Sequence, residues 1–154
     1  TISKASLEKV FEISELSTVD YSYNAVARAY EEDGATPKYY VAYEGTVTAG
    51  IDFSKIVIDI DEDTKIITIT LPESEIQNTT VDFGSMDYIF ENKKYETETV
   101  SQEAYELCKT DLARRAAKEN DLMTLAKENA VTAVEALVDP WVQQIDGEYK
   151  VNIK

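Results

Sequence analysis

Apolar and polar side chains alternate along several stretches in the first half of the chain, and the pattern changes in the second half. Residues 38–51 alternate, and so do KIVIDID (55–61) and KIITITL (65–71). From residue 99 onward, apolar residues instead recur every three or four positions. A period of two indicates strands and a period near 3.6 indicates helices. We therefore expect one α+β domain over residues 1–154, in which an antiparallel β-sheet of about five or six strands packs against a long C-terminal helix and a short N-terminal helix.

The short N-terminal helix is expected over residues 4–13. Its apolar positions stand at helical spacing, and they are Leu7, Val10 and Phe11. The hydroxyls of Ser3 and Ser6 offer caps for the first backbone N–H groups of this helix.

The C-terminal part carries an alanine-rich apolar stripe. Its members recur at intervals of three, four or seven residues: Tyr105, Cys108, Leu112, Ala116, Met123, Ala126, Ala130, Val134 and Leu137. Thr99 and Gln102 have the order of a capping box at its start. The stripe predicts one long helix, or two helices joined near Asn120 and Asp121.

The two halves of this stripe are expected to find different partners. The sheet built from residues 18–83 should cover the half that contains Leu112, and residues 122–137 should pack on the N-terminal helix or on a second chain. Farther on, Asp139 and Pro140 have the order of an N-cap and a first helical residue, which predicts the start of a new short helix. A closing strand is indicated by the alternating residues Tyr149, Val151 and Ile153.

Turn residues divide the strand-rich part. A strand over residues 14–32 is expected to end in the acidic turn EEDGATP, and the next strand, over residues 38–51, contains Gly45 and Gly50, which indicate a bulge or a bend. Residues 84–98 are polar and predict a long loop. Three residues are expected to fix this loop to the core: Tyr88, Ile89 and Phe90.

The stretch IDIDEDT (58–64) carries aspartates at alternate positions, as a calcium loop of the EF-hand type does at its start. Such a loop also needs glycine at its sixth position and glutamate at its twelfth, where this chain has Thr64 and Thr70. The alternating pattern instead places Asp59 and Asp61 on the solvent face of a strand. We therefore expect a β-hairpin here and no metal.

The formal net charge of −15 argues against nucleic acid as a partner, because phosphate backbones need a basic surface. The densest group of basic residues is Lys109, Arg114, Arg115 and Lys118. Because Asp111 and Glu119 accompany them, we interpret this group as the solvated face of a helix and not as a phosphate site.

Histidine is absent from the chain, which removes the commonest general base, the Ser-His and Cys-His nucleophile pairs, and the commonest zinc ligand. The single cysteine, Cys108, falls on the apolar side of the predicted helix, which indicates a buried, unreactive thiol. No residue constellation identifies catalytic residues, and we expect no cofactor.

Tyrosine is abundant, with ten residues in the chain. Five of them fall in two predicted strands that should be neighbours: Tyr21, Tyr23, Tyr39, Tyr40 and Tyr43. An apolar ring with a polar tip suits a binding platform for a carbohydrate or a peptide. It also suits cross-strand packing, which is the preferred interpretation. These five residues are nevertheless the candidates for ligand binding.

No apolar run approaches the ~20 residues that span a bilayer. The sequence begins Thr-Ile-Ser without methionine, and we expect a further segment before Thr1 in the natural protein. Contact with a membrane is expected only through such a segment, which is absent from this chain.

The run EGTVTAGIDFSKIVIDIDEDTKIITITLPESEI (44–76) resembles the signature block of a bacterial family of unknown function, DUF4230. DYSYNAVARAYEE (20–32) and LARRAAKENDLMTLAKENA (112–130) are similar to that family as well, so the resemblance covers nearly the whole chain. The resemblance implies an α+β domain that is commonly preceded by a membrane-anchoring helix, and that therefore lies outside the cytoplasm. It supplies no catalytic residues.

These observations favour a non-enzymatic, membrane-tethered extracytoplasmic domain that binds a protein or a cell-surface component. The alternative is a hydrolase that uses carboxylates on a cell-surface or carbohydrate substrate. A deep pocket with two converging carboxylates favours the hydrolase, whereas a flat or grooved surface favours binding.

Overall fold

The computed structural model describes residues 2–12 and 18–154. Its helices are α1 (Lys4–Glu12), α2 (Val100–Ala117) and α3 (Asn120–Ile145), together with the short 3-10 helices η1 (Phe53–Lys55), η2 (Phe83–Ser85) and η3 (Lys93–Tyr95). Its strands are β1 (Thr18–Tyr30), β2 (Pro37–Gly50), β3 (Val57–Asp61), β4 (Ile66–Thr70), β5 (Glu75–Val81), β6 (Asp87–Phe90) and β7 (Lys150–Ile153). The α+β fold class is therefore confirmed. The parts of the first predicted helix and strand that fall on residues 13–17 lie outside the described residues.

The elements form two compact units, and the strands form two sheets where the sequence predicted one. The central unit consists of Asp20–Thr48 and Ile76–Asn120. The terminal unit consists of Ala49–Glu75, Asp121–Lys154 and the described residues up to Val19. The second sheet arises because β7, from the far end of the chain, pairs with β4, and an alternating pattern does not tell which strands become neighbours.

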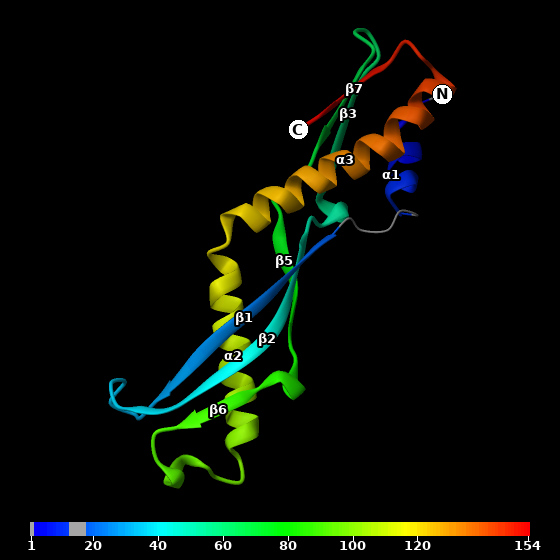
Figure 1. Cartoon of the computed structure of the whole chain (residues 1–154). Helices are drawn as coiled ribbons and strands as arrows, with labels where there is room; N and C mark the ends of the chain where they lie inside the picture. Colours follow the sequence, from blue (N-terminus) through cyan, green and yellow to red (C-terminus); the bar gives the residue numbers. More distant parts are fainter. Residues whose placement is uncertain (1, 13–17) are drawn as a thin grey trace. The chain divides into compact units, whose positions relative to one another are not determined.

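The sheet of the central unit has the strand order β1-β2-β5, and β6 also pairs with β2. Every second side chain of β2 is buried from Tyr39 to Ala49, while Ala42, Glu44 and Thr46 are exposed. Helix α2 runs along the buried face (Figure 1), so the other face of β2 is open to solvent. This burial pattern follows the alternation of residues 38–51 in the sequence.

The stretch predicted as a loop over residues 84–98 contains strand β6. It pairs antiparallel with β2, with Tyr39 opposite Phe90 and Ala42 opposite Asp87. The rings of Tyr88 and Phe90 pack on Tyr39, whereas Ile89 points away and is 69% exposed. The prediction that all three residues of this group fix the segment to the core was therefore wrong for Ile89, because the side chains of a strand alternate between its two faces.

Gly45 allows α2 to approach β2 closely. A Cβ atom built at this position would lie 2.7 Å from Cδ2 of Leu112 and 3.2 Å from the carbonyl oxygen of Thr80. Leu112 is fully buried, which confirms that the sheet covers this part of the helical stripe. Gly45 thus lies within a continuous strand, where the absence of a side chain makes room for a helix.

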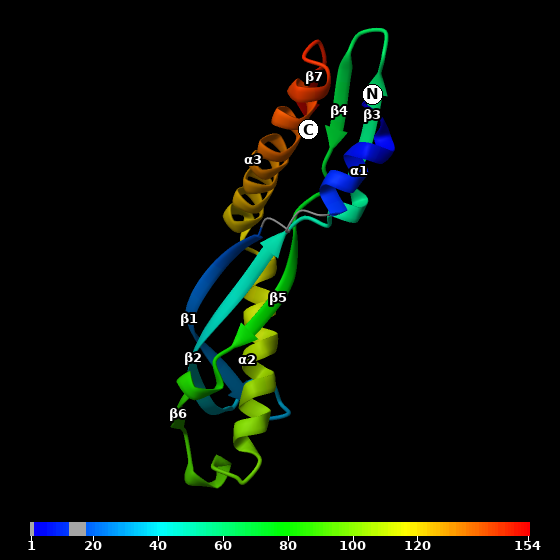
Figure 2. The same ribbon diagram turned by 90° about the vertical axis from the view of Figure 1, so that its right-hand side faces the viewer.

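The terminal unit contains the β3–β4 hairpin, whose register pairs Ile58 with Ile69 and Ile60 with Ile67. Strand β7 extends this sheet in parallel orientation, with Ile66 opposite Lys150. Figure 2 shows α3 running along this sheet and α1 beside β3. One apolar core joins these elements, and its buried members include Leu7, Phe11, Ile58, Ile67, Ile69, Val134, Val138 and Val142. Of the predicted segment 122–137, Ala130 and Val134 share this core with Leu7 and Phe11 of the N-terminal helix, and the second sheet contributes to the same core.

The turn of the β3–β4 hairpin is stabilised by Asp61, one of the three aspartates that suggested a calcium loop. Oδ1 of Asp61 accepts hydrogen bonds from the backbone N–H groups of Asp63 and Thr64, at 3.0 and 3.2 Å. Lys65 completes the turn with a φ of +59°. The predicted hairpin is confirmed, and the Asp61 side chain acts as an acceptor within its own turn.

Two helix boundaries test the predicted caps. Ser3 and Ser6 exchange backbone-to-hydroxyl hydrogen bonds at the start of α1, as expected. Thr99 stands at the N-cap of α2, but its hydroxyl donates to the Glu103 carboxylate and caps no backbone group, so the predicted capping box with Gln102 was wrong.

Pro140 lies inside α3, so the predicted new helix at Asp139 was also wrong. A proline inside a helix removes one hydrogen bond and costs about 3 kcal/mol. On either side of it, Val138 and Val142 are fully buried in the terminal core. We attribute the continuation of α3 to this burial, which outweighs the local cost.

We expect Leu112→Ala to lower the free energy of unfolding of the central unit by about 2–5 kcal/mol, because it leaves a cavity where the helix meets Gly45. Denaturant unfolding followed by NMR, which reports each unit separately, measures this loss. Leu125→Ala is the matched control, since Leu125 is exposed on α3 and its truncation should change stability by less than about 0.5 kcal/mol. Equal stability of both variants would contradict the packing described for α2.

Candidate functional site

An open trough lies on the central sheet where β1, β2 and the end of β5 meet. Its volume is about 600 Å³, and we call it the sheet trough. Six polar residues contribute to its lining: Ser22, Asn24, Glu44, Thr46, Thr80 and Asp82. No lysine or arginine belongs to its lining as far as the structure describes the chain. The trough therefore offers carboxylate, amide and hydroxyl groups, which together can donate and accept hydrogen bonds with a ligand rich in hydroxyl groups.

The wall of the sheet trough is held by contacts between β2 and the segment that follows β5. The backbone N–H of Asp82 donates to the Glu44 carbonyl at 2.9 Å, and the Ser85 hydroxyl accepts from the Glu44 N–H at 2.8 Å. The Asp82 carboxylate accepts from the Gly84 N–H at 3.0 Å and so caps η2. The backbone of Glu44 on β2 and the carboxylate of Asp82, which follows β5, are thus held beside the same open space.

Phe83 adds an aromatic ring to the rim of the sheet trough. It is 56% exposed, and its ring packs on that of Tyr105 at a centroid distance of 5.7 Å. An exposed ring supported from one side offers an apolar surface next to polar groups, as sugar-binding sites require.

The five tyrosines proposed for ligand binding do not form one platform. Tyr39 and Tyr43 are buried, at 3% and 2% exposure, on the face covered by α2. Tyr40 is half-buried and belongs to the opposite face of β2. Tyr21 is 46% exposed, and its ring packs on that of Tyr23 at a centroid distance of 4.9 Å.

Tyr23 is the one member of this group of five that contributes to the sheet trough. Its hydroxyl is buried and has no hydrogen-bond partner within the described ranges. Burial, and then the charge of Glu119, raise the pKa of this phenol. The pairing of β1 with β2 brought the tyrosines into one sheet as expected, and the alternation of faces then separated them.

A second arrangement, which the sequence did not indicate, surrounds Asp111 on the buried side of α2. The Asp111 side chain is only 5% exposed and accepts hydrogen bonds from the Tyr43 hydroxyl at 2.6 Å and from Nε of Arg115 at 2.7 Å. Nη2 of Arg114 donates to its other oxygen. We call Asp111, Tyr43, Arg114 and Arg115 the Asp111 cluster. The interpretation of this stretch as a solvated helix face was wrong for Asp111, because Tyr43 of β2 draws its carboxylate into the interface.

The electrostatics of the Asp111 cluster favour the charged carboxylate. Burial alone raises the pKa of Asp111, but the hydrogen bonds from Tyr43 and Arg115 and the charges of the two arginines outweigh it, so the pKa lies below its usual value of 3.8. Burial, and then the bond to Asp111, raise the pKa of the Tyr43 phenol, which stays protonated and donates. The buried Asp111 carboxylate is therefore paired and hydrogen-bonded, while the side chains of Arg114 and Arg115 remain 64% and 42% exposed.

Cys108 is fully buried one turn before Leu112 in α2. Burial, and then the nearby Asp111 charge, raise the pKa of its thiol to about 11. A thiol with so high a pKa is almost wholly protonated at neutral pH and is a poor nucleophile.

Two kinds of feature are absent from the described residues. No group of three or more Cys, Asp or Glu side chains is arranged to hold a metal ion in this part of the chain. None of the described helices is both long enough and apolar enough to cross a membrane.

The Tyr43–Asp111 bond is expected to couple the sheet to α2. In a double-mutant cycle with Tyr43→Phe and Asp111→Asn, we expect a coupling free energy of about 1–3 kcal/mol, since the bond joins a buried hydroxyl to a charged group. Denaturant unfolding of the four proteins measures it. Additive losses would show that the two side chains do not interact in the folded chain.

The same pair predicts a dependence on pH. Because the folded pKa of Asp111 is lowered, its stabilising contribution is complete above the unfolded pKa, about 3.9, and is lost as the pH falls through the lower folded pKa. When the pH is lowered from neutral to strongly acidic, the free energy of unfolding of Asp111→Asn should therefore fall less than that of the parent protein. Parallel acid unfolding curves for the two proteins would contradict this assignment.

Comparison with known proteins places both units in one family. No curated protein matched the chain. No solved structure matched it either. A family model described as "Protein of unknown function (DUF4230)" matches residues 8–153, which is nearly the whole chain and confirms the resemblance drawn from the sequence. The chain therefore belongs to the DUF4230 family.

Proposed function

We propose that this protein is a non-enzymatic binding domain and that the sheet trough is its ligand site. The observation that carries the proposal is the composition of the trough: six polar residues and the exposed ring of Phe83 around about 600 Å³, without a lysine or arginine in the described lining. A neutral ligand rich in hydroxyl groups matches this composition, since carboxylates and amides accept or donate to hydroxyls and the ring covers the apolar face of a sugar. The ligand class is therefore a carbohydrate, as found in cell-surface components.

The carboxylates of the trough suit binding better than hydrolysis. A glycosidase needs one carboxylic acid that remains protonated near neutral pH, which requires a dry, apolar surrounding. Glu44 and Asp82 are both exposed, and Asp82 is already engaged as the cap of η2. The hydrolase that acts on a carbohydrate is the alternative function, because both carboxylates line one trough.

The proposal includes a location outside the cytoplasm, where the domain is held by an anchoring segment that precedes it in the natural protein. The support for this location is what the family resemblance implies. A carbohydrate ligand agrees with it, since bacterial glycans are concentrated at the cell surface.

Binding is tested with tetrasaccharides of glucose and of N-acetylglucosamine, using NMR shifts of backbone amides as the readout. We expect saturable shifts at residues 22–24, 44–46 and 80–83, and at least about fivefold weaker binding in Asn24→Ala and Glu44→Gln, since each removes hydrogen bonds to the ligand. Glu91→Gln is the charge-matched control, because Glu91 is exposed and does not line the trough.

The same samples separate the two functions. If a saccharide is cleaved by the parent and not by Asp82→Asn, the domain is a hydrolase and the binding proposal fails. If the amide shifts stay unchanged up to about 10 mM of either saccharide, any dissociation constant lies above that concentration, and the proposed ligand class is refuted.

The location is tested on the whole natural protein in spheroplasts. We expect protease added outside to digest this domain while a cytoplasmic marker protein stays intact, because an extracytoplasmic domain is not shielded by the membrane. Immunoblotting of both proteins gives the readout. Protection of the domain until the spheroplasts are lysed would place it in the cytoplasm and contradict the proposal.

A further inference from the structure

All three arginines of the chain line one pocket. The pocket lies between β1 and α2 in the central unit and has a volume of about 350 Å³. Arg28 comes from β1, and Arg114 and Arg115 come from α2. We call it the arginine pocket. The chain as a whole has 15 basic and 30 acidic side chains, so a pocket whose lining carries a net positive charge requires an explanation.

The Asp111 cluster explains part of this arrangement. Arg115 donates through Nε to Asp111 and through Nη2 to the Val26 carbonyl at 3.1 Å, and Arg114 donates to Asp111 through Nη2. Each guanidinium carries five N–H donors, so these bonds leave donors on both groups. Asp111 supplies one negative charge against three positive ones, and the pocket keeps an excess of positive charge.

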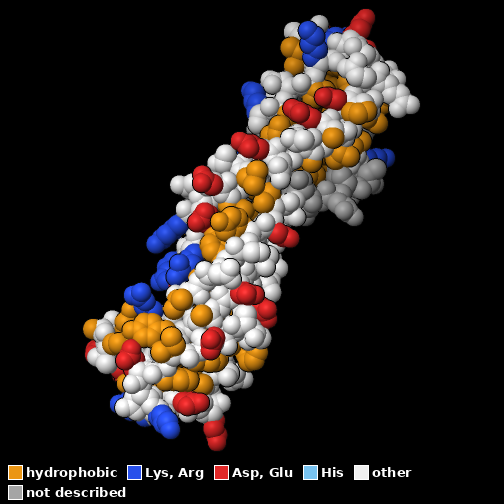
Figure 3. Space-filling view, viewed as in Figure 1, with side chains coloured by type: hydrophobic (Ala, Val, Ile, Leu, Met, Phe, Trp, Pro, Cys, Tyr) orange, Lys and Arg blue, Asp and Glu red, His pale blue; other side chains and the backbone are white. Residues whose placement is uncertain are grey.

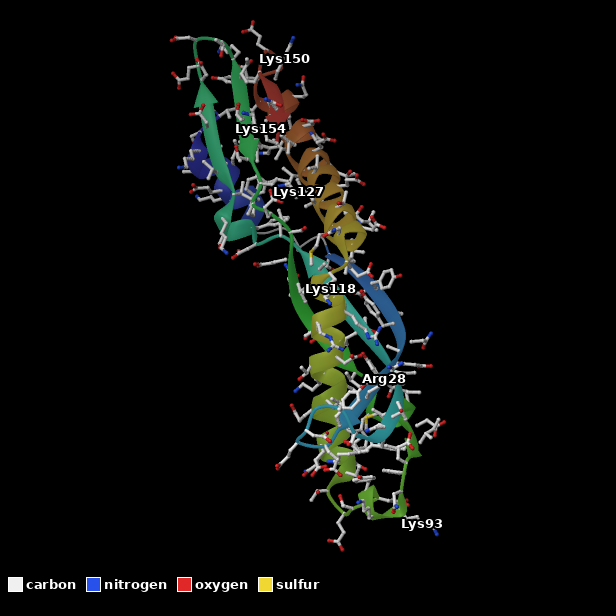
Figure 4. The ribbon with its side chains drawn as sticks, turned by 90° about the vertical axis from the view of Figure 1, so that its left-hand side faces the viewer. Arg28, Lys93, Lys118, Lys127, Lys150 and Lys154 are labelled. Atoms are coloured by element: carbon white, nitrogen blue, oxygen red, sulfur yellow. The ribbon has the colours of Figure 1, made fainter. Side chains whose placement is uncertain are left out.

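Arg28 has no part in the Asp111 cluster. It is exposed on β1, and no carboxylate of the described residues forms an ion pair with it. Figure 4 shows this side chain on β1 beside α2, and Figure 3 shows Lys and Arg side chains gathered beside the C-terminal part of α2. The Arg28 guanidinium is therefore available to a ligand, and arginine suits oxyanions because its planar group can donate two parallel hydrogen bonds to them.

The remaining lining adds apolar surface. Val26 and Tyr30 stand two residues before and two residues after Arg28 on β1, and all three line the pocket. The side chains of Val26 and Tyr30 are 48% and 43% exposed, and Leu107 faces them from α2. The hydroxyl of Thr110 also borders the pocket. A ligand that fits this lining carries an oxyanion next to a planar or apolar group.

We propose that the arginine pocket binds an oxyanion, a carboxylate or a phosphate, attached to an apolar or planar group. Arg114 and Arg115 are held in place by Asp111, and Arg28 completes the site from the opposite wall. This proposal does not rest on the sheet trough: the trough takes neutral hydroxyl groups, whereas this pocket takes a negative charge. The net charge of the chain repels anions at long range, so the binding energy comes from short, charge-assisted hydrogen bonds.

Four probes separate the chemistry of the ligand: phenyl phosphate, benzoate, inorganic phosphate and the neutral benzamide. We expect phenyl phosphate or benzoate to give saturable NMR shifts of backbone amides at residues 26–30 and 107–115, and benzamide to give none. Tighter binding of phenyl phosphate identifies phosphate as the preferred oxyanion, and tighter binding of benzoate identifies carboxylate. Equal affinity for inorganic phosphate and phenyl phosphate would overturn the role of the apolar wall.

Arg28→Gln is the test variant, because Arg28 does not hold Asp111 and its loss leaves the Asp111 cluster intact. We expect its affinity for the better probe to fall at least about fivefold, and Arg28→Lys to recover only part of it, since lysine lacks the planar fork. Lys93→Gln removes one positive charge elsewhere in the central unit and should leave the affinity within about twofold. Amide shifts that are absent up to about 10 mM of each anion, or equal losses in Arg28→Gln and Lys93→Gln, would overturn the proposal.

Discussion

The central unit depends on the close contact between α2 and β2. At Gly45 an added Cβ atom would lie 2.7 Å from Cδ2 of Leu112, so a side chain at this position would force the leucine to shift. The preceding helical residue, Asp111, then reaches the hydroxyl of Tyr43, two residues away along the same strand. The Asp111 side chain is only 5% exposed, and in such surroundings a hydrogen bond to a charged group is strong while an unpaired charge is costly. The carboxylate therefore needs compensating cations, and Arg114 and Arg115 supply them.

This requirement connects the core to the surface. Arg115 is fixed at one end by Asp111 and at the other by the Val26 carbonyl on β1. Because β1 is an edge strand of the central sheet, Arg115 also occupies a backbone acceptor that would otherwise be available to another chain. A buried carboxylate thus positions two guanidinium groups at the wall of the arginine pocket, which supports the proposal that this pocket binds an anion.

The opposite faces of β2 have different roles. The face toward α2 is filled by aromatic and aliphatic side chains, including Tyr39 and Tyr43. The solvent face presents Glu44 and Thr46 to the sheet trough. Because adjacent residues of a strand point in opposite directions, a single stretch of sequence supplies both the core of the unit and its candidate ligand site. The abundance of tyrosine is therefore explained largely by packing, and Tyr23 is the member of the five candidates that also borders the trough.

The sequence by itself determined the periodic features: the α+β class, both faces of β2, the hairpin at residues 57–70, and the burial of Cys108 and Leu112. Each follows from the nearest neighbours along the chain and from the alternation of apolar and polar positions. Only the tertiary structure decided which strands pair, and so divided them into two sheets with β7 beside β4. It also carried α3 through Pro140, where burial of Val138 and Val142 outweighs a local preference. The Asp111 cluster and the arginine pocket were likewise decided by the tertiary structure. Tyr43 and Asp111 are 68 positions apart in the sequence, and Arg28 and Arg114 are farther apart still. Contacts over such separations depend on chain topology, and the sequence pattern around each residue carries no record of them.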